Sequence, residues 1–188
     1  MKEQLLEVIN EYINIYHEDE RLKQLIDYIT KYKYEELTDW NNFDGHIVAS
    51  GFIYDISTNK FLVIYHKDQK MYLYPGGHVD REDQNILSAA IREVKEETGI
   101  NNFDEYKVSN NELVPFDIDI HKMPHNGRLD LPEHYHYDFR YLFIVNNIND
   151  IKIDQEESSD YKWVSLEEMK SFHFGKITNK LEKIISNL

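Results

Sequence analysis

Three glutamates near the middle of the chain are spaced to project from one side of a helix. Glu93, Glu96 and Glu97 stand at positions i, i+3 and i+4, which are neighbours on a helical surface. Three like charges so close repel one another, and the macrodipole also disfavours anions near the C-terminal end of a helix. Two unfavourable charge arrangements within one helical turn indicate a functional site. A divalent cation would relieve both penalties, because Mg²⁺ binds carboxylate oxygens together with water and substrate phosphates. The alternative is an ordinary solvated acidic face.

The residues around these glutamates extend the pattern over positions 76–100, GGHVDREDQNILSAAIREVKEETGI. This segment resembles the signature of the Nudix hydrolase family, G-x5-E-x7-R-E-U-x-E-E-x-G-U, in which U is a bulky apolar residue. Gly77 matches the opening glycine, and the stretch from Arg92 to Ile100 matches at every specified position. Asp83 stands where the signature has its first glutamate, nine residues before Arg92 instead of eight, and Glu82 is a rival for the same position.

The resemblance implies metal-dependent hydrolysis of a diphosphate bond in a small nucleoside-diphosphate-linked substrate, with Mg²⁺ or Mn²⁺ as the cofactor. The implied metal ligands are the side chains of Glu93, Glu96 and Glu97 and the backbone carbonyl of Gly76. Arg92 is expected to hold a neighbouring carboxylate in place. The implied catalytic residues are Glu96, Glu97, Arg92 and a general base outside the signature, for which Glu157 is the candidate, with Glu156 nearly as suitable. An exposed loop acid without a catalytic role is the alternative for both.

A second polar group lies in residues 134–140, HYHYDFR. Because side chains alternate along a strand, His134, His136, Asp138 and Arg140 are predicted to share one face. We expect His136 and Arg140 to contact the phosphate, base or sugar of the substrate. Ordinary pairing at the surface is one alternative. Zinc binding by His134 and His136 is another, but two histidines without a third ligand are a weak signal.

Two residues next to the signature are further candidates for substrate contact. His78 directly follows the glycines and is placed to reach phosphate. Tyr74 precedes them in a short aromatic stretch, where its ring would either stack on a base or belong to the core.

The composition narrows the function classes. The chain has 188 residues, of which 41% are hydrophobic and 30% charged, as in a globular protein. Its 21 basic and 35 acidic residues give a net charge of −14, which disfavours nucleic-acid polymers as partners but not small phosphorylated substrates. The absence of cysteine excludes disulfides and thiolate metal sites. No apolar stretch is long enough for a membrane helix, and with no targeting segment the expected location is the cytoplasm.

Hydrophobic periodicity and turn residues predict the elements that position these residues. Helices are expected over residues 2–37, as a hairpin broken at 17–20 with Asp19 as a cap, and over 85–98, ending at Gly99. Strands are expected at 46–55, 60–66, 71–74, 114–121, 137–145 and 161–164, with a loop at 125–133. A capping box at 165–168 is expected to begin a helical tail that runs to Leu188.

Strands that mix with a few helices predict an α+β fold of mixed layers. The resemblance implies the Nudix fold, with a mixed central sheet flanked by helices. We expect a helical extension over residues 1–40, packed on a Nudix hydrolase domain over 41–188. The apolar faces of the extension are compatible with a homodimer.

Two other functions remain open at this point. A Nudix-fold protein that senses a nucleotide without hydrolysing it is the first, and the retained glutamates argue against it. Hydrolysis at the 5′ end of RNA is the second, and the acidic net charge argues against it.

Overall fold

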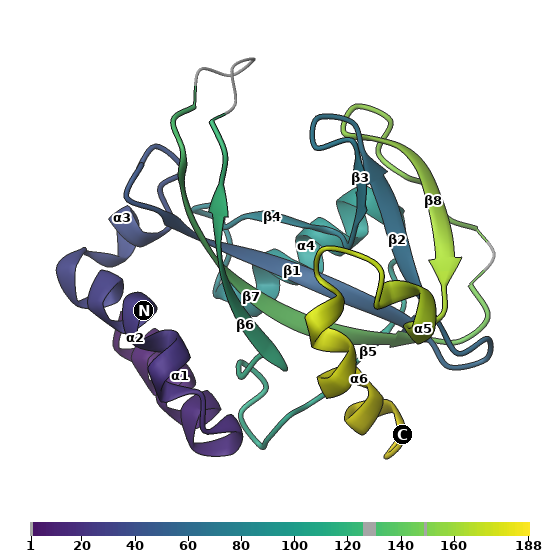
Figure 1. Ribbon diagram of the computed structural model, residues 1–188, viewed down its shortest axis with the longest axis horizontal. Coiled ribbons are helices and arrows are strands. Elements are labelled where there is room, and N and C mark those ends of the chain that lie inside the picture. Colours follow the sequence, from purple (N-terminus) through teal and green to yellow (C-terminus); the bar gives the residue numbers. More distant parts are fainter. Residues whose placement is uncertain (1, 126–130, 149) are drawn as a thin grey trace. The chain divides into compact units, whose positions relative to one another are not determined.

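The computed structural model describes residues 2–125, 131–148 and 150–188. Its helices are α1 (Lys2–Tyr16), α2 (Asp19–Lys31), α3 (Tyr34–Leu37), α4 (Ile86–Thr98), α5 (Leu166–Met169), the 3₁₀ helix η1 (Gly175–Ile177) and α6 (Thr178–Ile185). Its strands are β1 (His46–Asp55), β2 (Lys60–His66), β3 (Met71–Leu73), β4 (Gly76–His78), β5 (Asp104–Glu105), β6 (Asp117–Met123), β7 (His134–Val145) and β8 (Ser158–Val164) (Figure 1).

These elements form two compact units, each built from separate pieces of the chain. The first unit comprises residues 1–50, 76–93 and 107–141, and the second comprises 51–75, 94–106 and 142–188. Three elements, β1, α4 and β7, each continue from one unit into the other.

The first unit contains two antiparallel strand pairs, β1 with β4 and β6 with β7. Residues 48–50 of β1 pair with β4, which sets Ala49 opposite Gly77. Strand β6 pairs with β7 along its full length, from Asp117 opposite Arg140 to Met123 opposite His134. Because the register is continuous, the side chains of 134, 136, 138 and 140 lie on one face of β7, as the alternation predicts.

The helical hairpin of α1 and α2 packs within this first unit (Figure 1). Its apolar stripe is buried and consists of Leu5, Val8, Ile9, Leu22, Leu25 and Ile29. The Tyr28 ring stacks on Tyr137 of β7 with 4.5 Å between centroids, and its hydroxyl donates to the carbonyl of Gly45. The Tyr12 hydroxyl lies 3.3 Å from Asp117 of β6, and burial together with that carboxylate raises the pKa of Tyr12. The hairpin is thus attached to β6 and β7 by polar contacts as well as by apolar ones.

The second unit holds an apolar core. Strand β2 lies between β3 and β8 and also pairs with residues 53–55 of β1. Its side chains Phe61, Leu62, Val63 and Ile64 are all buried. The short strand β5 pairs with residues 143–144 of β7. Ser165 and Glu168 form the reciprocal capping box predicted for the start of α5.

Several predicted elements need correction. The residue before α2 is Glu18, without a side-chain cap, so Asp19 is the first helical residue and not the cap. The predicted C-terminal helix is interrupted between α5 and η1, where turns around Phe172 and Gly175 break the helical hydrogen bonds. The strand predicted at 114–121 begins at Asp117, and those predicted at 137–145 and 161–164 begin three residues earlier than expected, at His134 and Ser158. The two short strands β4 and β5 were not predicted, because three and two residues leave no periodicity to detect. Of the predicted loop at 125–133, residues 126–130 lie outside the described part.

Candidate active site

Helix α4 carries the glutamates of the signature, and both of its ends are defined by local hydrogen bonds. At the N-terminal end, the Ser88 amide donates to Oδ1 of Asn85 at 2.8 Å, and the Asn85 amide donates to Oγ of Ser88 at 3.0 Å. At the C-terminal end Gly99 has φ +71° and donates to the Lys95 carbonyl at 2.9 Å, which is the predicted glycine cap. The helix therefore runs without interruption through all three glutamates.

Arg92 lies in the part of α4 that belongs to the first unit, where it donates hydrogen bonds to several neighbouring acceptors. Its guanidinium donates to both carboxylate oxygens of Asp83, at 3.2 and 2.9 Å, and to Glu93 at 2.9 Å. It also donates to the His78 carbonyl at 2.8 Å. Oδ2 of Asp83 also accepts from the Asp80 amide at 2.8 Å, so Asp83 links Arg92 to the loop that precedes the helix. Glu82, the rival for its signature position, is exposed in the same loop.

Gly77 lets the Glu93 carboxylate lie directly against the backbone of β4. A Cβ at position 77 would stand 2.6 to 2.9 Å from the three carboxylate atoms of Glu93. Only glycine allows this approach without moving the carboxylate. The neighbouring Gly76 faces β1 instead, and a Cβ there would meet the Ala49 carbonyl at 2.7 Å.

The remaining acids of the expected site belong to the second unit. Glu96 is exposed and Glu97 is buried. The carbonyl of Glu97 accepts from the Asp154 amide at 3.2 Å, which ties the segment before β8 to the end of α4. Glu156 and Glu157 follow in that segment as exposed turn residues, and the Glu157 carbonyl accepts from the Lys67 amide at 2.9 Å.

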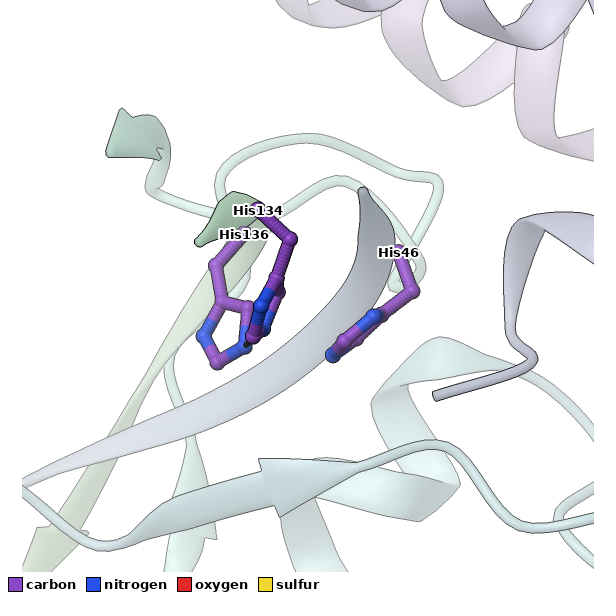
Figure 2. Close-up of side chains that lie close together, drawn as sticks. All are labelled: His46, His134 and His136. Carbon is purple, nitrogen blue, oxygen red and sulfur yellow. Dashed lines mark hydrogen bonds between the residues drawn. The ribbon is translucent and has the colours of Figure 1, made fainter. Parts of the chain in front are cut away.

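Four histidines converge in the first unit, at the start of β1, the end of β4 and the start of β7. Figure 2 shows His134 and His136 of β7 turned toward His46 of β1. The Nε2 atoms of His134 and His136 are 3.2 Å apart, and those of His46 and His78 are 3.1 Å apart. His46 lies with its ring centroid 4.9 Å from that of His134 and 4.7 Å from that of His136. We call His46, His78, His134 and His136 the histidine cluster.

The surroundings of three rings of the histidine cluster, those of His46, His78 and His136, lower their pKa values. Burial, followed by the neighbouring His78 and His134, lowers the pKa of His46 to about 3. Burial likewise lowers the pKa of His136, with further contributions from the other rings. The pKa of His78 is also lowered, first by the protein packed around its ring, although the residue as a whole is exposed. At neutral pH the imidazoles of His46, His78 and His136 therefore offer lone pairs and not positive charge.

Arg140 is buried and engaged by three carboxylates. Its guanidinium donates to Asp138 at 2.8 Å, Asp117 at 3.2 Å and Asp119 at 2.8 Å. Asp138 also accepts from the Ser50 hydroxyl at 2.7 Å. Burial alone would raise the pKa of Asp119, but its hydrogen bond with His121 and the charge of Arg140 outweigh this and lower it to about 2. The alternation of β7 predicted Asp138 on the same face as Arg140, whereas Asp117 and Asp119 come from β6, and the sequence did not reveal them as partners.

Tyr74 is half-buried in the second unit among aromatic rings. It stacks on Phe52 with centroids 4.3 Å apart and meets Phe174 edge-on at 5.0 Å. Both contacts are with residues of its own unit, so the ring is part of an aromatic group there.

The residues of α4 fit a hard divalent cation. The donor set is all carboxylate oxygen, which suits Mg²⁺ and Mn²⁺. Glu93 is already held by Arg92 and packed on Gly77, so this ligand is positioned before any ion binds. Both observations agree with the expected chemistry of the signature.

Comparisons with known proteins agree with this assignment. Residues 45–188 match the model of the NUDIX domain. The chain is 32% identical over 142 residues to a protein of Lactococcus lactis subsp. cremoris described as a probable DHNTP pyrophosphohydrolase, covering 76% of this chain and 78% of that one.

Solved structures show the same fold. An Ap4A hydrolase of C. elegans superposes with a TM-score of 0.58 at 20% identity, covering 76% of this chain and 98% of that one. The dihydroneopterin triphosphate pyrophosphohydrolase of E. coli gives a TM-score of 0.56 at 16% identity, covering 76% and 96%.

The chain belongs to the Nudix family and has its mixed α+β fold. Within that family it is an enzyme, a Nudix-type pyrophosphohydrolase that hydrolyses a diphosphate bond. Within the described residues, no helix combines the length and apolar character needed to cross a membrane.

Proposed function

We propose that this enzyme uses Mg²⁺ or Mn²⁺ to hydrolyse a diphosphate bond in a small nucleoside-diphosphate-linked substrate. The observation that carries the proposal is the unbroken helix α4, with Glu93, Glu96 and Glu97 along it and Glu93 held by Arg92. A structural role alone would not favour three carboxylates within one helical turn.

The proposed ion would be held by Glu93, Glu96 and Glu97 and the carbonyl of Gly76. When bound, such an ion neutralises charge on phosphate oxygens and lowers the pKa of a coordinated water. Arg92 acts as a positioning residue, since it fixes Glu93 on one side and the loop through Asp83 on the other. Glu157 is proposed to accept the proton of the attacking water, with Glu156 as the alternative.

For the substrate, we propose phosphate contact by the exposed His78 and stacking of a ring system on Tyr74. Arg140 is a less direct contributor, because a phosphate would have to compete with three carboxylates for its guanidinium. We therefore propose that Arg140 positions β6 against β7. The half-buried His136 faces the other imidazoles of the histidine cluster.

The similar proteins support the class of substrate. The names of the L. lactis and E. coli proteins point to a pterin triphosphate, and that of the C. elegans protein to Ap4A. We propose that the substrate is likewise a small molecule with a phosphate chain. The division into an extension over 1–40 and a Nudix domain over 41–188, the cytoplasmic location and a homodimer remain predictions, and light scattering tests the last.

A hydrolysis screen with Mg²⁺ and Mn²⁺ tests the proposal. The panel contains dihydroneopterin triphosphate, nucleoside triphosphates, nucleotide sugars, dinucleoside polyphosphates and coenzyme A. Glu96→Gln should abolish turnover of the best substrate, whereas Glu7→Gln, the same change on the exposed face of α1, should leave it intact. Turnover by the wild type that needs no divalent ion, or that survives Glu96→Gln, would refute the proposed metal role.

A further inference from the structure

We propose that the histidine cluster is a second metal site, in which His46, His134 and His136 bind a zinc-class divalent ion through imidazole nitrogen. One ligand atom from each of these residues lies within 4.8 Å of the others. This site shares none of the carboxylates proposed to bind Mg²⁺, so the inference does not depend on the proposed function.

The spacing of the nitrogens fits a small tetrahedral ion. Zinc–nitrogen bonds of about 2.0–2.1 Å place two imidazole nitrogens of a tetrahedral site about 3.3 Å apart. The Nε2 atoms of His134 and His136 are separated by 3.2 Å, and those of His46 and His78 by 3.1 Å. Neighbouring rings thus present their nitrogens at close to the separation that a shared ion requires.

The outer nitrogen of His134 is held as in known zinc sites. Its Nδ1 lies 2.8 Å from the carbonyl of Pro132. A carbonyl only accepts, so Nδ1 carries the proton and Nε2 has the lone pair that points at His136. Ligating histidines usually donate their second N–H to a carbonyl or carboxylate in this way.

His121 adds a similar arrangement at the edge of the cluster. Its ring meets His136 edge-on with centroids 5.4 Å apart, and its Nδ1 lies 2.9 Å from Asp119. The edge of the cluster thus holds a further imidazole that is oriented by a carboxylate, the arrangement in which histidine commonly supports a metal site. The ligand atoms that the three proposed residues offer are all imidazole nitrogens. Imidazole favours zinc, copper and nickel over magnesium.

The architecture of the first unit keeps the rings together without an ion. Strand β1 begins where β7 begins, and a Cβ on Gly45 would come within 2.7 Å of the Tyr135 carbonyl. His46, the next residue, is therefore brought to the side of β7 that carries His134 and His136. Since the three rings are already gathered in the folded chain, binding requires no refolding.

Zinc binding by the tag-free full-length protein, stripped with a chelator, tests the inference. We expect one equivalent of Zn²⁺ to remain with the wild type after gel filtration, and Zn²⁺ to raise the melting temperature. Replacing bound Zn²⁺ by Co²⁺ should give the visible absorption of a nitrogen-ligated tetrahedral ion. The double variant His134→Gln/His136→Gln should lose affinity by about 100-fold or more.

Three further proteins make the result decisive. His17→Asn removes an exposed imidazole outside the cluster, at a residue whose φ of 55° asparagine tolerates, and should bind Zn²⁺ like the wild type. Glu96→Gln should also retain zinc, which separates this site from the carboxylates of α4. His46→Gln serves if the double variant fails to fold, as judged by its melting temperature in chelator. If the wild type binds no Zn²⁺, or if the folded cluster variants bind it equally well, the cluster is a network of imidazole hydrogen bonds and the inference is wrong.

Discussion

The glutamates of α4 and the histidine cluster differ in how they are assembled. The glutamates stand within five consecutive residues of one helix, whereas the histidines come from positions 46, 78, 134 and 136 on three strands. The first group offers carboxylate oxygen, and the second offers imidazole nitrogen. The two groups of side chains therefore suit different ions. The lesson is that a site built on one element can be recognised from sequence, while a site built by strand pairing requires the fold.

The largest effect should come from Glu97→Gln on α4. Loss of this carboxylate is expected to reduce kcat on the order of 10³-fold, because it weakens the stabilisation of developing charge. The melting temperature should not fall, since the substitution also removes a repulsion worth a few tenths of a kcal/mol. Turnover assays and thermal unfolding check both points. If the variant unfolds, Glu97 has a structural role instead. If it also loses zinc binding, the glutamates and the histidine cluster are not independent sites.

The two signature glycines should respond differently to alanine. Gly77→Ala pushes the Glu93 carboxylate aside, so we expect kcat to fall about 10- to 100-fold with little loss of stability. Gly76→Ala meets the backbone of β1 and should cost about 1–3 kcal/mol of unfolding free energy. Steady-state kinetics and urea unfolding of both variants measure the contrast. Equal losses of stability would show that the Glu93 contact has no special role.

His78 should have a graded effect on zinc. It touches His46 through Nε2 but lies outside the group of three proposed ligands, so His78→Gln should lower zinc affinity about tenfold. Competition titration with a zinc indicator measures this value, with His17→Asn as the control. A loss as large as that of the double variant would instead make His78 a direct ligand.

The smallest expected effect concerns Asp119 beside the histidine cluster. Its carboxyl stays ionised in the folded chain down to about pH 2, against an ordinary value of 3.8. A depressed pKa stabilises the fold above pH 3.8, and this contribution disappears as the pH falls toward 2. The difference in melting temperature between wild type and Asp119→Asn should therefore be greatest above pH 4 and shrink below it. A difference that is independent of pH would mean that ionisation of Asp119 contributes nothing.

Much of the fold was predictable because its elements are long and periodic. The strands at 46–55 and 60–66 were placed at their observed bounds, and helix α4 was misplaced by one residue only. The failures are short or irregular segments. The break between α5 and η1 depends on turns that no hydrophobic period marks, and strand β4 exists because Gly76 and Gly77 can pair with β1.

The two regions also differ in what sequence reasoning revealed about them. The glutamates, Arg92 and Gly77 were all named from the signature, and the assignment of the glutamates as metal ligands stays a prediction. In the second region the alternation of β7 pointed to His134 and His136, but a third ligand was missing. His46 looked like the first residue of an apolar strand. Only the pairing of distant segments brings its ring to within 5 Å of the other two.

The contact between Tyr28 and Gly45 bears on how this protein should be handled. Matches to a family model commonly guide where a gene is truncated for expression, and here the match begins at residue 45. A protein cut at that point would lose the ring that covers Tyr137 and the hydroxyl bonded to the Gly45 carbonyl. The truncated protein would expose the ring of Tyr137, and exposed apolar surface of this kind promotes self-association. The start of the family match, residue 45, is therefore a poor place to truncate this chain.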